Sequence, residues 1–225
     1  YDTYLLKDVA SALVDVGQFD KARKIANELS DPDEIHEFNN RLRIHRQTAL
    51  EMSRRQLDPT PVIDEAVEWV FKKKVPDGRE DMRKSDLSQL AVTMAQCGQY
   101  ERALRFMEEN KIESDSSGFD EVGMPGPYSA VAIAMARDGK PAEAQELASK
   151  WGQYSDSKYN PRALAEIAGA WARAGEYGKA AEIVRDIEKH TQTGHHIYSW
   201  EIPHALDVVT TAAIDKLDVY VLGKD

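Results

Sequence analysis

Apolar residues recur along this chain at helical spacing, and the pattern itself is repeated. Between Leu164 and Ile187 one apolar stripe runs up to a turn at residues 174–177, and a second stripe follows it. Spacings of three and four residues place such side chains on one face of a helix. The stretch therefore predicts two helices joined by a tight turn.

The same arrangement occurs around three other glycines, with no gap across 24 aligned positions. Each turn glycine is followed by an aromatic residue or proline and then by an alanine, and glycine after a helix favours a positive φ. Independent amphipathic helices would not share these three features, so we predict a repeat. The turn glycines are Gly17, Gly98, Gly139 and Gly175.

A degenerate copy is expected between the first two turn glycines. Its predicted turn lies near Pro61, with Ile63 and Ala66 in the aromatic and alanine positions and a first helix within residues 37–56. Arg54 falls where the other copies place a small residue. We expect one domain, 1–225, with repeats at about 4–32, 37–75, 85–112, 127–151 and 162–190 and a capping helix at 204–217.

Two short helices cannot bury their apolar faces alone, whereas stacked pairs bury them against their neighbours. The predicted fold class is therefore all-α, a right-handed α-solenoid of about five helical hairpins plus a terminal capping helix.

Composition narrows the possible functions. The formal net charge of −10 argues against sequence-independent binding of nucleic acid, which needs cations against phosphates. Cys97 is the only cysteine, so an intrachain disulfide and a cysteine-based zinc site are excluded and a reducing, cytoplasmic location is expected. No long apolar run predicts a membrane span. Because the chain begins with Tyr1, we expect a fragment of a longer protein.

Three segments resemble the tetratricopeptide repeat (TPR): LLKDVASALVDVGQFDKA, DLSQLAVTMAQCGQYERA and ALAEIAGAWARAGEYGKA. A fourth, YSAVAIAMARDGKPAEA, has Pro141 in place of the aromatic residue, and the repeats are spaced more widely than the usual ~34 residues. The resemblance implies a non-enzymatic scaffold that binds peptides or protein surfaces in a concave groove lined by first helices. Pentatricopeptide arrays share the plan, but their RNA-reading members are generally basic.

By resemblance, groove positions are mostly small or weakly apolar. Such a wall would accept a bulky partner segment, or small residues would merely fill a tightly curved groove. Lys7 matches a carboxylate-clamp position, but Ser11 stands where asparagine is needed, so we predict no clamp. The expected groove residues are Lys7, Ser11, Val14, Ser88, Val92, Ala95, Ser129, Ile133, Ala136, Ala165, Gly169 and Ala172.

Arginines offer two further hypotheses. Arg137 and Arg173 lie at equivalent positions before their turns, where they would grip an acidic ligand or offset a helix dipole. The segment 41–84 is basic, and its arginines would form a patch for an acidic partner or an ordinary solvated surface. These arginines are Arg41, Arg43, Arg46, Arg54 and Arg55.

Signals for catalysis and metal binding are incomplete. His36-Glu37 begins like a zinc-protease motif, but Asn40 replaces the second histidine. Four histidines fall close together without the spacing of a standard metal site; they are His190, His195, His196 and His204. We therefore predict no enzyme activity, no cofactor and no metal.

The function expected is a protein-interaction scaffold that binds a partner chain or a neighbouring domain, also using the loop 113–127. The alternative is a regulatory or substrate-recruiting arm of an enzyme whose catalytic domain lies outside this chain. A pentatricopeptide-like RNA binder is disfavoured by the charge.

Overall fold

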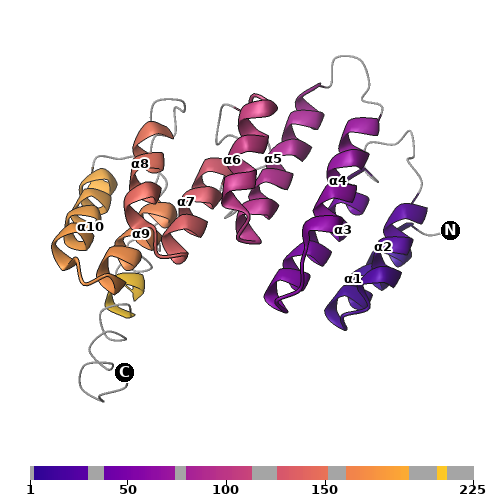
Figure 1. Cartoon of the computed structure of the whole chain (residues 1–225), viewed down its shortest axis with the longest axis horizontal. Coiled ribbons are helices and arrows are strands. Elements are labelled where there is room, and N and C mark those ends of the chain that lie inside the picture. Colours follow the sequence, from indigo (N-terminus) through magenta and orange to yellow (C-terminus); the bar gives the residue numbers. More distant parts are fainter. Residues whose placement is uncertain are drawn as a thin grey trace. The chain divides into compact units, whose positions relative to one another are not determined.

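The computed structural model describes residues 3–29, 38–73, 80–112, 126–151, 161–192 and 207–211. These residues form ten helices, α1 to α10, and a short helical segment at 207–211, and they contain no strand (Figure 1). The prediction of an all-α fold is confirmed for this part of the chain.

The helices follow one another in pairs, each pair at a predicted repeat. The first helices are α1 (Thr3–Asp15), α3 (Phe38–Arg54), α5 (Glu80–Gln96), α7 (Pro127–Arg137) and α9 (Pro161–Arg173). The second helices are α2 (Phe19–Glu28), α4 (Thr60–Lys72), α6 (Tyr100–Glu109), α8 (Pro141–Trp151) and α10 (Tyr177–Gln192).

Four pairs share one turn. Their glycines have φ values of +78°, +78°, +76° and +85°, as predicted for a glycine that ends a helix. At the first of them, the Gly17 amide donates to the Val14 carbonyl and the Gln18 amide to the Leu13 carbonyl, at 2.9 and 2.8 Å. This is the Schellman arrangement, and it recurs at Gly98, Gly139 and Gly175.

The degenerate pair uses the same turn with a different residue. Gln56 has φ +59°, its amide donates to the Ser53 carbonyl, and the Leu57 amide donates to the Met52 carbonyl. The turn therefore begins at Gln56 and not near Pro61, where the sequence suggested it; Pro61 lies in the first turn of α4 instead. Lys111, at φ +52°, ends α6 in the same way.

The chain divides into two compact units, Tyr1–Ile112 and Glu113–Asp225. In the first unit α1 packs on α2 and α3, α3 on α4 and α5, and α5 on α4 and α6. In the second unit α7 packs on α8 and α9, and α9 on α8 and α10. Helices thus contact their neighbours in chain order, as stacked hairpins do. A solenoid over the whole chain stays a prediction.

Small residues lie where the helices of a pair meet. The repeated alanines of both helices are fully or almost fully buried, which allows close approach of the two axes. These alanines are Ala10, Ala22, Ala91, Ala103, Ala132, Ala144, Ala168 and Ala180.

The helical segment 207–211 lies against α9. A Cβ added to Gly169 would fall 2.5 Å from Cγ1 of Val208, so glycine permits this close approach. Val209 packs against the apolar cluster formed by α7 to α10. The remainder of the predicted capping helix 204–217 lies outside the described residues.

Candidate functional site

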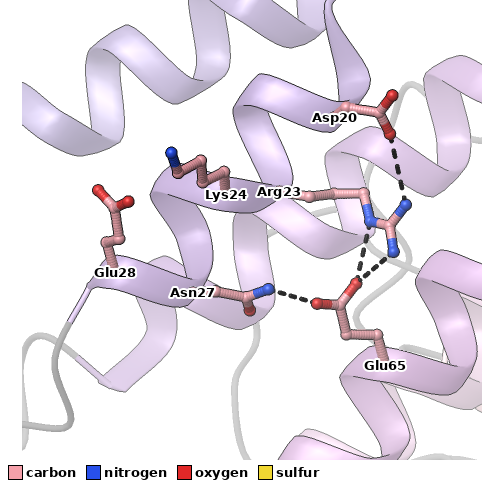
Figure 2. Close-up of a pocket in the computed structure, with 6 residues that line it drawn as sticks. All are labelled: Asp20, Arg23, Lys24, Asn27, Glu28 and Glu65. Atoms are coloured by element: carbon pink, nitrogen blue, oxygen red, sulfur yellow. Dashed lines mark hydrogen bonds and ion pairs between the residues drawn. The ribbon is translucent and has the colours of Figure 1, made fainter.

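A shallow depression of about 390 Å³ lies on the surface of α2 and α4 in the first unit (Figure 2). All of its lining residues are polar or charged, so their side chains offer polar contacts to a ligand. The lining residues are Asp20, Arg23, Lys24, Asn27, Glu28 and Glu65.

The Glu65 carboxylate, on α4, is held by two residues of α2. Nε and Nη2 of Arg23 donate to its Oε2 at 2.9 and 2.8 Å, and Nδ2 of Asn27 donates to Oε1. Arg41, on α3, donates from Nη2 to Oδ1 of Asn27 at 2.6 Å. Burial alone would raise the pKa of Glu65, but the hydrogen bonds from Asn27 and Arg23 outweigh it and lower that pKa. The carboxylate is therefore ionised and fixed in place.

His45, on α3, is electrostatically coupled to this cluster. It is buried, and neither ring nitrogen has a hydrogen-bond partner among the residues that the structure describes. Burial lowers the pKa of His45 to about 4; the Glu65 carboxylate opposes this shift, and the charges of Arg41 and Arg23 add to it. His45 is therefore neutral at pH 7.

A buried ion pair links the end of α4 to α5. Nζ of Lys73 lies 2.6 Å from Oδ2 of Asp86, and both side chains are almost fully buried. The ammonium also lies over the Trp69 ring, 5.1 Å from its centroid. Burial raises the pKa of Asp86 above its usual value, although the hydrogen bond from Lys73 opposes the shift. The pair therefore fixes a junction between helices and lies away from solvent.

The expected groove wall stays a prediction, and the structure gives the burial of its positions. Ten of its positions are buried, so a partner cannot touch these side chains; Lys7 and Ser11 remain half-buried. Small residues here serve the packing of helices, as for Gly169 under Val208. The buried positions are Val14, Ser88, Val92, Ala95, Ser129, Ile133, Ala136, Ala165, Gly169 and Ala172.

The two equivalent arginines are both exposed. Arg137 forms an ion pair with Glu166 of α9, so it joins two first helices in addition to facing solvent. Nothing in this contact favours an acidic ligand over a structural role for Arg137. Gly169 lies near the guanidinium of Arg173.

Four of the five arginines of the basic segment engage internal partners, and Arg43 is exposed. Arg41 bonds to Asn27, Arg46 to Thr93 and Gln89, and Arg54 and Arg55 to Glu51. Their charges are therefore distributed among contacts within the first unit, which favours the interpretation as an ordinary helix surface over a patch for an acidic partner.

Cys97 is half-buried, and burial raises the pKa of its thiol to about 11. Over the described ranges no three His, Cys, Asp or Glu side chains are grouped so that they could hold a metal ion. The clustered histidines His190, His195, His196 and His204 and the loop 113–125 lie outside the side chains that the structure describes. In the same ranges, no helix has the length and apolar character needed to cross a bilayer.

The cluster around Glu65 was not predicted from the sequence. One signal was present, because the helical period places His45 on the same face as Leu42 and Ala49, which are buried. Charges on α2 and α4 show no such periodic signal. Their pairing depends on how the two helices pack.

No model of a known protein family matches the chain, and a search among curated proteins also finds no match.

Proposed function

We propose that the chain is a protein-interaction module built from TPR-like helical hairpins, and that it binds a partner polypeptide at the depression on α2 and α4. The observation that carries this proposal is the prearranged set of charges there. Because Arg23 and Asn27 already hold Glu65, little side-chain entropy is lost at this residue when a partner binds.

The rim of the depression determines the kind of partner. Lys24 and Glu28 are exposed and lie one helical turn apart on α2, and Asp20 lies one turn before Lys24. A partner segment that carries both acidic and basic side chains would complement this rim. Binding through exposed charges weakens as salt is added, because the Debye length falls below 10 Å above about 0.1 M salt.

Affinity capture followed by quantification of the retained partner tests the proposal. Reversing two rim charges in Lys24→Glu/Glu28→Lys should weaken the retained interaction about tenfold, since each exposed charge contact contributes about 0.2–1 kcal/mol. Lys21→Glu is the matched control, because Lys21 is exposed on the same helix and does not line the depression. A partner retained equally by all three proteins would overturn the proposal.

Substitutions in the expected groove would not give this information. Val92 and Ile133 are buried, so a glutamate at either position would place a charge in the packed interior. Loss of a partner in such a variant would report unfolding.

A further inference from the structure

One face of α1 exposes apolar side chains. Leu5 is 62% exposed and Val9 42% exposed, and Ala12 is exposed beside them. Positions four and seven residues apart lie on one side of a helix, so these residues form a single stripe. We call the stripe, together with Asp8, the α1 face.

The equivalent positions of later first helices are buried. Alignment on the turn glycines places Val9 with Leu90 of α5 and Ile167 of α9, which are 1% and 0% exposed. Helix α5 packs on α3 and α4, and α9 packs on α7 and α8. The preceding hairpin therefore covers this side of α5 and of α9. The positions equivalent to Leu5 and Ala12 are buried as well; they are Asp86, Thr93, Ala163 and Ala170.

The same alignment shows which residues of the later first helices are equivalent to Asp8. Asp8 corresponds to Gln89 of α5 and to Glu166 of α9. Gln89 accepts a hydrogen bond from Arg46 of α3, and Glu166 forms an ion pair with Arg137 of α7. In both later pairs, an arginine on the preceding first helix thus reaches this position. The Asp8 side chain is 70% exposed and next to Lys7, 3.2 Å from its Nζ.

We propose that the α1 face is one half of a hairpin–hairpin interface, and that its occupant is a helical hairpin of the same repeat type. The occupant presents an apolar surface to Leu5, Val9 and Ala12 and carries an arginine on its first helix, opposite Asp8. Two observations support this occupant: the same face is covered by such a hairpin on α5 and α9, and the acidic Asp8 complements the arginine found there. The inference is independent of the depression on α2 and α4.

A fusion to the full chain tests the proposal. Residues 126–158, which contain a copy of α7 and α8, are placed directly before Tyr1, because Tyr1 aligns with position 159. The appended hairpin should cover the α1 face, so amide hydrogen exchange in α1 should slow about tenfold or more relative to the parent chain. A fusion with the same 33 residues in scrambled order is the matched control.

Variants of the fusion test the contacts. Val9→Glu should abolish the slowing, and the unfused Val9→Glu chain should keep its circular dichroism because Val9 is half-exposed. Asp8→Arg should reduce the slowing, and Arg137→Asp in the appended copy should restore it. Unchanged exchange in α1 of the parent fusion would overturn the proposal. A dimer of the unfused chain that dissociates in Val9→Glu would also overturn it, because the occupant would then be a second copy.

Discussion

Two residues, Gln56 and His45, occupy positions that are unfavourable for their backbone or side-chain chemistry. Gln56 adopts a left-handed conformation that glycine occupies at the four equivalent turns. His45 is neutral and buried in a helix that packs on four others. Each of these residues should reduce the stability of the fold, and each gives a prediction with a definite sign.

Replacing Gln56 with glycine should stabilise the chain by about 1 kcal/mol, because glycine adopts φ +59° without the steric cost that a Cβ imposes. Gln96→Gly should have the opposite sign, with a loss of about 0.5–1 kcal/mol, because Gln96 is helical. Urea unfolding monitored by circular dichroism measures both changes. Destabilisation by Gln56→Gly would show that the glutamine side chain stabilises the turn.

The pKa of His45 predicts acid sensitivity. The unfolded chain binds the imidazole proton below pH ~6.5, whereas the folded chain binds it only near pH 4. Stability should therefore fall as the pH drops from 6.5 towards 4, by about 3 kcal/mol in total from this group. The charges of Glu65, Arg41 and Arg23 also act on His45. The contribution of His45 to the pH dependence is therefore isolated by comparing the parent with a variant that lacks the imidazole.

His45→Leu should remove this component of the pH dependence, because leucine does not titrate and fits a buried site. The difference in unfolding free energy between parent and variant is measured at several values from pH 7 to pH 4. An identical slope for the two proteins would contradict the assignment.

At the scale of elements, the repeat pattern predicted the hairpins because helical spacing and turn glycines are local signals. The turn at Gln56 was misplaced because glutamine carries no such signal. The burial of the expected groove positions Val92 and Ile133 was not predicted, since it depends on helices distant in sequence. The depression on α2 and α4 was missed for the same reason.

The junction of α4 and α5 should depend on the Lys73–Asp86 pair. Asp86→Ala should cost about 3–5 kcal/mol, because it leaves the Lys73 ammonium buried without its carboxylate partner. The double variant Lys73→Met/Asp86→Leu should lie within about 1 kcal/mol of the parent, because an apolar pair removes both charges. Chemical denaturation measures all three proteins. Equal losses in the single and double variants would show that shape, and not charge, governs this site.

The contact between α9 and residues 207–211 should be sensitive to one methyl group. Gly169→Ala would bring Cβ against Val208, so the segment must shift and its amide exchange should rise about tenfold. Gly178→Ala is the control, because its Cβ meets nothing within 4 Å and the higher helix propensity of alanine adds about 0.5 kcal/mol. Unaltered exchange at 207–211 in Gly169→Ala would contradict this close approach.

At the scale of the whole molecule, two compact units each consist of helices that contact their neighbours in chain order. The order of hairpins followed from the repeat. The division after Ile112 did not, because it depends on which helices make tertiary contacts. In such packing the loss of a contact first lowers the stability of the adjacent helices.

Two buried valines of the first unit test how far a local loss extends. Val14→Ala in α1 and Val62→Ala in α4 should each cost about 2 kcal/mol. Exchange at low denaturant should rise in α1 to α3 for the first variant and in α3 to α5 for the second. The same set of faster amides in both variants would indicate that the unit opens as one block.

The high pKa of Cys97 has a practical consequence for spectroscopy. At pH 8 a thiol with a pKa of about 11 is ionised in only about one molecule in a thousand, so the native cysteine should react slowly with maleimides. A cysteine introduced at an exposed position such as Lys21 would be labelled hundreds of times faster, at about the usual pKa of 8.5. Fluorophores and spin probes can therefore be attached site-specifically while Cys97 stays in place.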